Sequence, residues 1–154
     1  MEMEFFDPVN WIWGLSLIAL TIAIHATGVV VLGLVTLNIR FRVTNRRLAP
    51  RHVISMVIGL VGSIGLLLAI LHGVEAAIWA AAYLWLGALD SPFEAILYSV
   101  DSLTTRGASG LKLPGHWRMM GALEAVGGMM LFGISTAFIF AMMQAYWPPL
   151  VRRR

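Results

Sequence analysis

Four ionisable residues interrupt otherwise apolar stretches of the sequence: His25, His72, Glu75 and Glu124. Imidazoles and carboxylates in such surroundings pair with one another, exchange protons near neutral pH or bind metal ions. Glu75 follows His72 by three residues, so the two share a helix face. His25 reaches a comparable depth on the preceding apolar stretch and can touch His72. Three interpretations stay open: an intramembrane polar cluster that fixes helix packing, a proton-responsive gate, and a metal site. Because the spacing matches no metal-binding motif, we assign no metal here.

A second polar group lies where Asp101 precedes a short segment rich in hydroxyl groups and glycine. That segment reads Thr104, Thr105, Arg106, Gly107, Ala108, Ser109 and Gly110. Asp101 and Arg106 carry opposite charges and are near enough in sequence to pair. The sequence contains no serine-histidine-acid order, glycine-rich phosphate loop or metal-binding helix motif. We therefore predict neither an enzyme nor a bound cofactor.

The elements that must position these residues are membrane helices. Hydrophobic residues make up 59% of the 154 residues and charged residues only 12%. Long uncharged runs occupy residues 8–39, 52–74 and 125–151, and a helix needs about 20 residues to cross a hydrocarbon core. The predicted fold is an all-α membrane protein with three transmembrane helices. The absence of cysteine excludes disulfides and thiolate metal sites.

The arginines predict the orientation of the chain. Five of them separate the first two apolar runs and three end the sequence: Arg40, Arg42, Arg46, Arg47 and Arg51, then Arg152, Arg153 and Arg154. Under the positive-inside rule both clusters are cytoplasmic, which places the N-terminus outside and the C-terminus inside a plasma (inner) membrane. We expect the basic loop to contact anionic lipid, and we expect no nucleic-acid partner.

Residues 89–117 on the outer side contain a short helix with a strong start signal. Ser91 is a candidate N-cap, Pro92 occupies the first helical position, and Glu94 completes a capping box. A helix from Pro92 to about Leu103 is roughly 18 Å long, too short to span. The chain must then return outward, as a re-entrant loop. Because non-helical backbone at membrane depth must be surrounded by protein or water, we expect a symmetric assembly around this loop.

The segment from about residue 70 to residue 147 resembles the potassium-channel superfamily, in particular its small prokaryotic members with one helix before the pore module. The resemblance rests on Thr104-Thr105-Arg106-Gly107 after the short helix, Trp117-Arg118 opening the last helix, Glu124, and the run Gly133 to Phe138. It implies a homotetramer with a central pore, in which 92–103 is the pore helix and 104–110 the selectivity filter. Residues 53–150 are then the pore module, residues 1–52 comprise the outer tail, first helix and basic loop, and residues 151–154 form a basic tail.

The altered filter sequence predicts a pore for monovalent ions with weak selectivity. Filter carbonyls and a threonine hydroxyl replace water around potassium in this superfamily. Thr105 and Gly107 keep two positions of the superfamily pattern, whereas Ala108, Ser109 and Gly110 stand where it has tyrosine, glycine and aspartate. The expected function is a potassium-channel-like ion channel that discriminates poorly among monovalent cations.

Arg106 leaves alternatives open. It can pair with Asp101 behind the filter and support the loop, it can form a pore-facing ring that passes anions, or the loop can be collapsed in a non-conducting structural or interaction protein.

Other predicted pore residues lie on the last helix. They are Gly127 and Gly128, as a gate hinge or a packing site, and Ser135, Thr136 and Gln144, as vestibule lining. The sequence names no regulatory partner.

Overall fold

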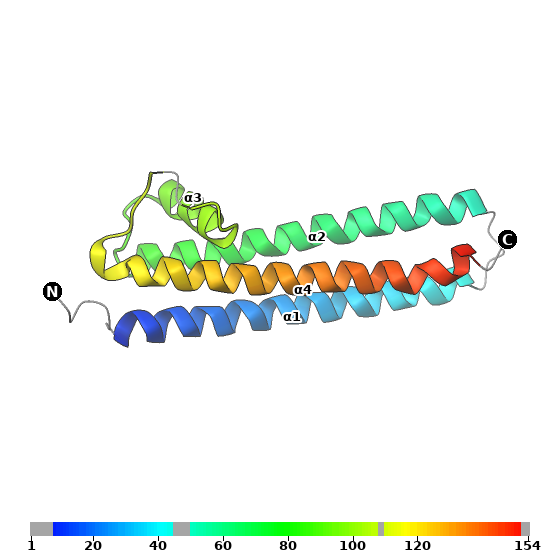
Figure 1. The fold of residues 1–154 in the computed structure, drawn as a ribbon, viewed down its shortest axis with the longest axis horizontal. Helices are drawn as coiled ribbons and strands as arrows, with labels where there is room; N and C mark the ends of the chain where they lie inside the picture. The colour runs from blue at the N-terminus through cyan, green and yellow to red at the C-terminus, as the bar shows by residue number, and fades with distance from the viewer. Residues whose placement is uncertain (1–7, 45–49, 108–109, 152–154) are drawn as a thin grey trace. The chain divides into compact units, whose positions relative to one another are not determined.

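The computed structural model describes residues 8–44, 50–107 and 110–151. Within these ranges it contains four α-helices and one 3₁₀ turn: α1 (Pro8–Thr44), α2 (Pro50–Trp85), α3 (Pro92–Leu103), η1 (Gly115–Trp117) and α4 (Arg118–Val151) (Figure 1). Three segments are long and apolar enough to cross a membrane: Pro8–Asn38, Ile54–Trp85 and Gly115–Ala145. The predicted all-helical fold with three candidate membrane spans is therefore confirmed.

Some predictions concern residues outside the described ranges. The filter residues Ala108 and Ser109 are among them, as are Arg46, Arg47 and the terminal Arg152, Arg153 and Arg154. The side chains of Arg40, Arg42 and Arg51 are also outside what the structure describes. Chain orientation therefore stays a prediction.

Proline marks the first residue of three helices, at Pro8, Pro50 and Pro92. Proline suits this position because its φ is already helical. It has no backbone N–H, but an N–H in the first turn would have no acceptor within the helix. The long apolar segments are helical because a helix pairs its backbone polar groups internally, as a bilayer requires.

The chain divides into two compact units. The first comprises the described part of Met1–His25 together with His72–Phe132, and it holds α3 and the loop after it. The second comprises Ala26–Leu71 and Gly133–Arg154, as far as these are described.

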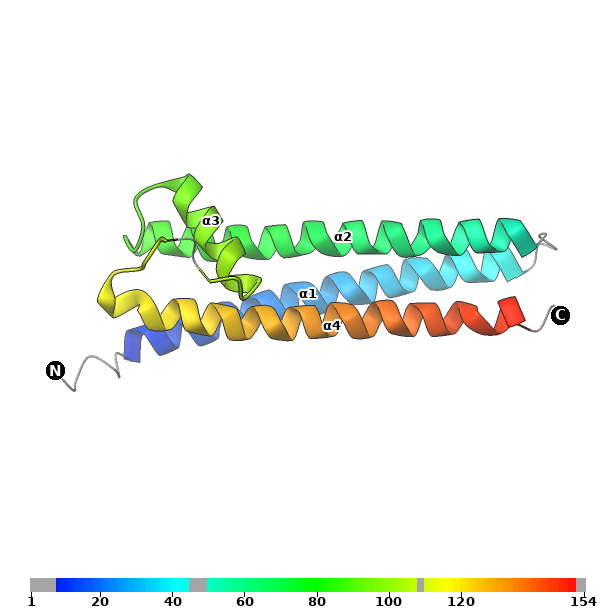
Figure 2. The ribbon, with the colours of Figure 1, turned by 45° about the horizontal axis from the view of Figure 1, so that its top comes forward.

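In the first unit, α3 lies beside the end of α2 and the beginning of α4 (Figures 1 and 2). Its buried residues contribute to two apolar clusters. One cluster consists of Leu17, Trp79, Tyr83, Ala88, Tyr98, Leu113 and Met120, and the other of Ala76, Leu103 and Leu131. Both clusters hold α3 against the flanking spans.

In the second unit, small residues allow close helix packing. A Cβ placed on Gly28 would lie 2.7 Å from Leu71 Cδ2, and the Thr36 hydroxyl donates to the sulfur of Met142 at 3.2 Å. Exposed apolar side chains such as Ile58 cover the outside of this unit. Such a surface suits lipid.

The start of α3 shows the N-cap half of the expected capping box. The hydroxyl of Ser91 accepts a hydrogen bond from the Glu94 backbone N–H at 3.4 Å, Pro92 is the first helical residue, and Glu94 is the acid of the first turn. The helix has 12 residues, so its length of about 18 Å is too short to cross a bilayer.

Candidate functional site

The end of α3 is closed by backbone hydrogen bonds from the loop that follows. The N–H of Thr105 donates to the carbonyl of Ser102 at 2.9 Å, and the N–H of Arg106 donates to the carbonyl of Asp101 at 3.0 Å. With Thr104 as C-cap, these two bonds form a Schellman motif. The motif fixes the direction in which the segment 104–110 leaves the helix.

Thr105 occupies the left-handed position of this motif, with φ of 55°. Glycine is usual there, and a side chain in this conformation costs about 1–2 kcal/mol. Gly107 and Gly110 also have positive φ, of 79° and 85°. Threonine at a position that favours glycine is backbone strain of the kind that gathers at functional sites.

Arg106 and Asp101 are in contact. Arg106 Nη1 donates to Asp101 Oδ1 at 3.3 Å. The carboxylate side chain is 2% exposed, but the arginine side chain is 70% exposed in the single chain. The Arg106–Asp101 contact expected under one of the three alternatives is therefore present, with its carboxylate buried and its guanidinium exposed in the single chain.

Glu124 of α4 joins three helices. Its carboxylate accepts hydrogen bonds from the Tyr83 hydroxyl of α2 at 2.7 Å and from the Ser99 hydroxyl of α3. Tyr98 packs edge-on against Tyr83, with ring centroids 5.4 Å apart, and burial raises the pKa of the Tyr98 phenol above its usual value. Because a buried carboxylate without partners is costly, this network ties the position of α3 to Glu124.

Gly127 and Gly128 lie inside the continuous helix α4, where both meet other helices. A Cβ on Gly127 would lie 3.2 Å from Ile18 Cγ1, and one on Gly128 would lie 2.8 Å from the backbone carbonyl carbon of Leu103. These close approaches are what we expect if the two glycines are packing sites. The hinge alternative stays a prediction.

A pocket of about 350 Å³ opens at the same end of α3. It is lined by Leu103, Thr104, Thr105, Met129 and Phe132. The two threonines that begin the segment 104–110 therefore border an open space beside α4.

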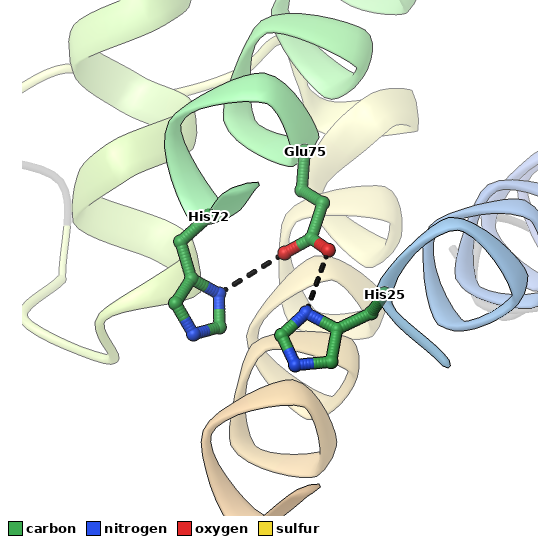
Figure 3. A group of neighbouring side chains, drawn as sticks. All are labelled: His25, His72 and Glu75. Atoms are coloured by element: carbon green, nitrogen blue, oxygen red, sulfur yellow. Dashed lines mark hydrogen bonds and ion pairs between the residues drawn. The ribbon is translucent and has the colours of Figure 1, made fainter. Parts of the chain in front are cut away.

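His25, His72 and Glu75 form a separate cluster between α1 and α2 (Figure 3). His25 Nδ1 lies 2.8 Å from Glu75 Oε1, and His72 Nδ1 lies 3.0 Å from Glu75 Oε2. The two imidazole centroids are 5.0 Å apart. Glu75 and His25 are fully buried and His72 is 16% exposed. One carboxylate thus joins two histidines from different helices.

The polar cluster predicted from the sequence is therefore wrong in one respect. Glu124 bonds to Tyr83 and Ser99, whereas Glu75 bonds to the two histidines. Sequence position gave the depth of each group but not the rotation of its helix.

The predicted vestibule residues belong to the second unit and differ in exposure. Ser135 is only 6% exposed, whereas Thr136 and Gln144 are exposed. A pore-lining side chain needs an open face, so burial argues against Ser135 in this role. The assignment of Thr136 and Gln144 stays a prediction.

Tyr83 and Ser99 are functional candidates that the sequence analysis missed. Each carries a hydroxyl group that is buried against Glu124. A signal was available: a carboxylate in a membrane span needs donors, and tyrosine and serine on neighbouring helices can supply them.

Comparison with protein-family models, curated proteins and solved structures finds no match to this chain. The function is therefore argued from the residues and their geometry.

Proposed function

We propose that the chain assembles as a homotetramer in a plasma (inner) membrane and forms an ion pathway at the loop after α3. The observation that carries the proposal is the capped helix α3, too short to span, which ends in an exposed segment with positive φ at Thr105 and Gly107 between two apolar spans. This is the order of elements in a pore loop. The sequence resemblance to the potassium-channel superfamily supports the same proposal.

The contacts around α3 favour a loop held in one conformation. The Schellman bonds and the Arg106–Asp101 contact hold its start, and Glu124 holds the buried face of α3 through Ser99. A selectivity filter needs this kind of support, because its carbonyls replace the hydration shell of an ion. Threonine stands at position 105 although glycine would cost less there, and its hydroxyl can serve the permeant ion.

The permeant ions of the proposed pathway are monovalent cations, with weak discrimination among them. The N-terminus is outside and the C-terminus cytoplasmic, with anionic lipid at the basic loop. A second candidate is an anion pathway, which the 70% exposure of the Arg106 side chain favours. Four such cations near one axis would attract anions and repel cations.

The test is current through purified protein in planar bilayers or liposomes, with asymmetric potassium, sodium and chloride. Reversal potentials that follow both alkali cations about equally support the cation pathway. A potential that follows chloride supports the arginine ring. A steep potassium preference contradicts the filter argument, and absence of current under all conditions supports a non-conducting protein. Native mass spectrometry tests the tetramer independently of current.

Arg106→Val provides an internal check, with Lys112→Val as the matched control. Lys112 is exposed in the same connection between α3 and α4, so both changes remove one cation. If Arg106 supports the filter, Arg106→Val destabilises the loop and lowers current without changing the sign of the permeant ion. A change of sign in Arg106→Val that is absent in Lys112→Val identifies a pore-facing ring.

A further inference from the structure

We infer that His25, His72 and Glu75 form a binding site for one transition-metal dication per chain, with Zn²⁺ as the probe. One ligand atom from each of the three residues lies within 4.8 Å of the others. Two imidazoles and one carboxylate suit zinc and its neighbours in the first transition series, whereas calcium and magnesium prefer oxygen ligands alone. The inference does not depend on the proposed ion pathway.

The distances fit a small ion. Tetrahedral zinc with bonds of about 2.0–2.2 Å requires separations of roughly 3.3–3.6 Å between its ligand atoms. The two imidazole–carboxylate distances are 2.8 and 3.0 Å, and all three ligand atoms lie within 4.8 Å. Small side-chain rotations that separate the carboxylate from the rings therefore make room for the ion.

Both imidazoles turn Nδ1 toward the same carboxylate (Figure 3). Coordination through Nδ1 needs its lone pair, so a hydrogen on Nδ1 must leave that atom, and Nε2 of the same ring can hold it. The carboxylate then accepts the metal in place of the two N–H groups. Three protein ligands leave one position for water, as in zinc sites that are not closed.

The surroundings preorganise the site and allow entry. His72 and Glu75 are three residues apart on α2, and His25 comes from α1. The His72 ring stacks on Phe132 of α4, with centroids 4.4 Å apart, which fixes its plane. Entry is past His72, because it is 16% exposed while the other two are fully buried. A bound metal would therefore cross-link the first span to the second.

The first experiment measures metal content. Full-length protein without an affinity tag is stripped with a chelator in detergent, reloaded with Zn²⁺, and analysed by mass spectrometry and titration calorimetry. We expect one zinc ion per chain. A stoichiometry near zero after removal of free zinc would overturn the inference.

Variants then identify the ligands. His25→Ala, His72→Ala and Glu75→Gln should each weaken zinc affinity by at least about tenfold, because even second-shell changes commonly have effects of this size. The double variant His52→Ala, His116→Ala is the matched control. Both of these histidines are exposed, and with His25 and His72 they complete the four of the chain. Loss of zinc in the control together with retention in the three single variants would refute the site.

X-ray absorption on zinc-loaded wild-type protein decides the outcome even where a variant fails to fold. The expected shell has two imidazole nitrogens and carboxylate or water oxygen at about 2.0–2.2 Å. A coordination shell of oxygen atoms alone, or one with no more than one imidazole nitrogen, would show that zinc binds elsewhere. The contacts of His25, His72 and Glu75 would then serve only to hold α1 against α2.

Discussion

Gly128→Ala tests whether α4 positions the end of α3. An ideal Cβ at Gly128 would lie 2.8 Å from both the carbonyl carbon and Cα of Leu103, the last residue of α3, and closer still to its carbonyl oxygen. Backbone atoms cannot rotate away as a side chain can, so α3 must shift. Overpacking of this kind costs about 1–3 kcal/mol, and the better helix propensity of alanine returns about 1 kcal/mol.

Gly133→Ala is the matched control, because it makes the same change in the same helix where nothing lies within 4 Å of the added Cβ. The propensity gain cancels between the two variants. Gly128→Ala should therefore have a free energy of unfolding about 1–3 kcal/mol below that of Gly133→Ala. The measurement is denaturant unfolding in detergent, followed by tryptophan fluorescence. Equal stability of the two variants would refute the reasoning.

A second comparison separates backbone from side-chain contacts. A Cβ on Gly14 would meet the Leu123 side chain, so Leu123→Ala should reduce the cost of Gly14→Ala. Leu103→Ala should bring no such relief to Gly128→Ala, because the obstacle there is backbone. Rescue by Leu103→Ala would show that the contact has been misassigned.

Three further predictions concern the hydrogen bonds around α3. A double-mutant cycle with Asp101→Asn and Arg106→Gln should give a coupling of about 0.2–1 kcal/mol in unfolding experiments, the range for pairs with an exposed partner; strict additivity would argue against the pair. Tyr83→Phe should lower the free energy of unfolding by about 1–3 kcal/mol, because it removes a buried donor to Glu124, and the loss should be smaller when Glu124→Gln is already present. Ser91→Ala should cost about 0.5–2 kcal/mol through loss of the N-cap, measured in the same way; unchanged stability would show that the cap contributes nothing.

The sequence alone was sufficient to predict the helical class and the short helix. The start and end predicted for the short helix, at Pro92 and about Leu103, coincide with α3. Its N-cap involves only residues 91 to 94, so neighbouring residues in the sequence are enough to predict it. The spans were also predictable, because charge is excluded from a hydrocarbon core over a length that sequence can count.

The segment after α3 was predictable only in part. The contact between Asp101 and Arg106 joins residues five positions apart, so it could be predicted from the sequence. The sequence left the exposure of the Arg106 side chain open, because exposure depends on which parts of the chain cover the loop.

What the sequence determined by itself is therefore the helices, their apolar character and the capped start of α3, since these follow from neighbouring residues and from the solvent that each segment meets. Tertiary structure alone decided the partners of Glu124. Tyr83 meets it across 41 positions of sequence and Ser99 across 25. These pairings depend on the rotation of each helix against its neighbours. Hydropathy does not encode this rotation, because an apolar helix buries its polar groups on whichever face packs against other helices.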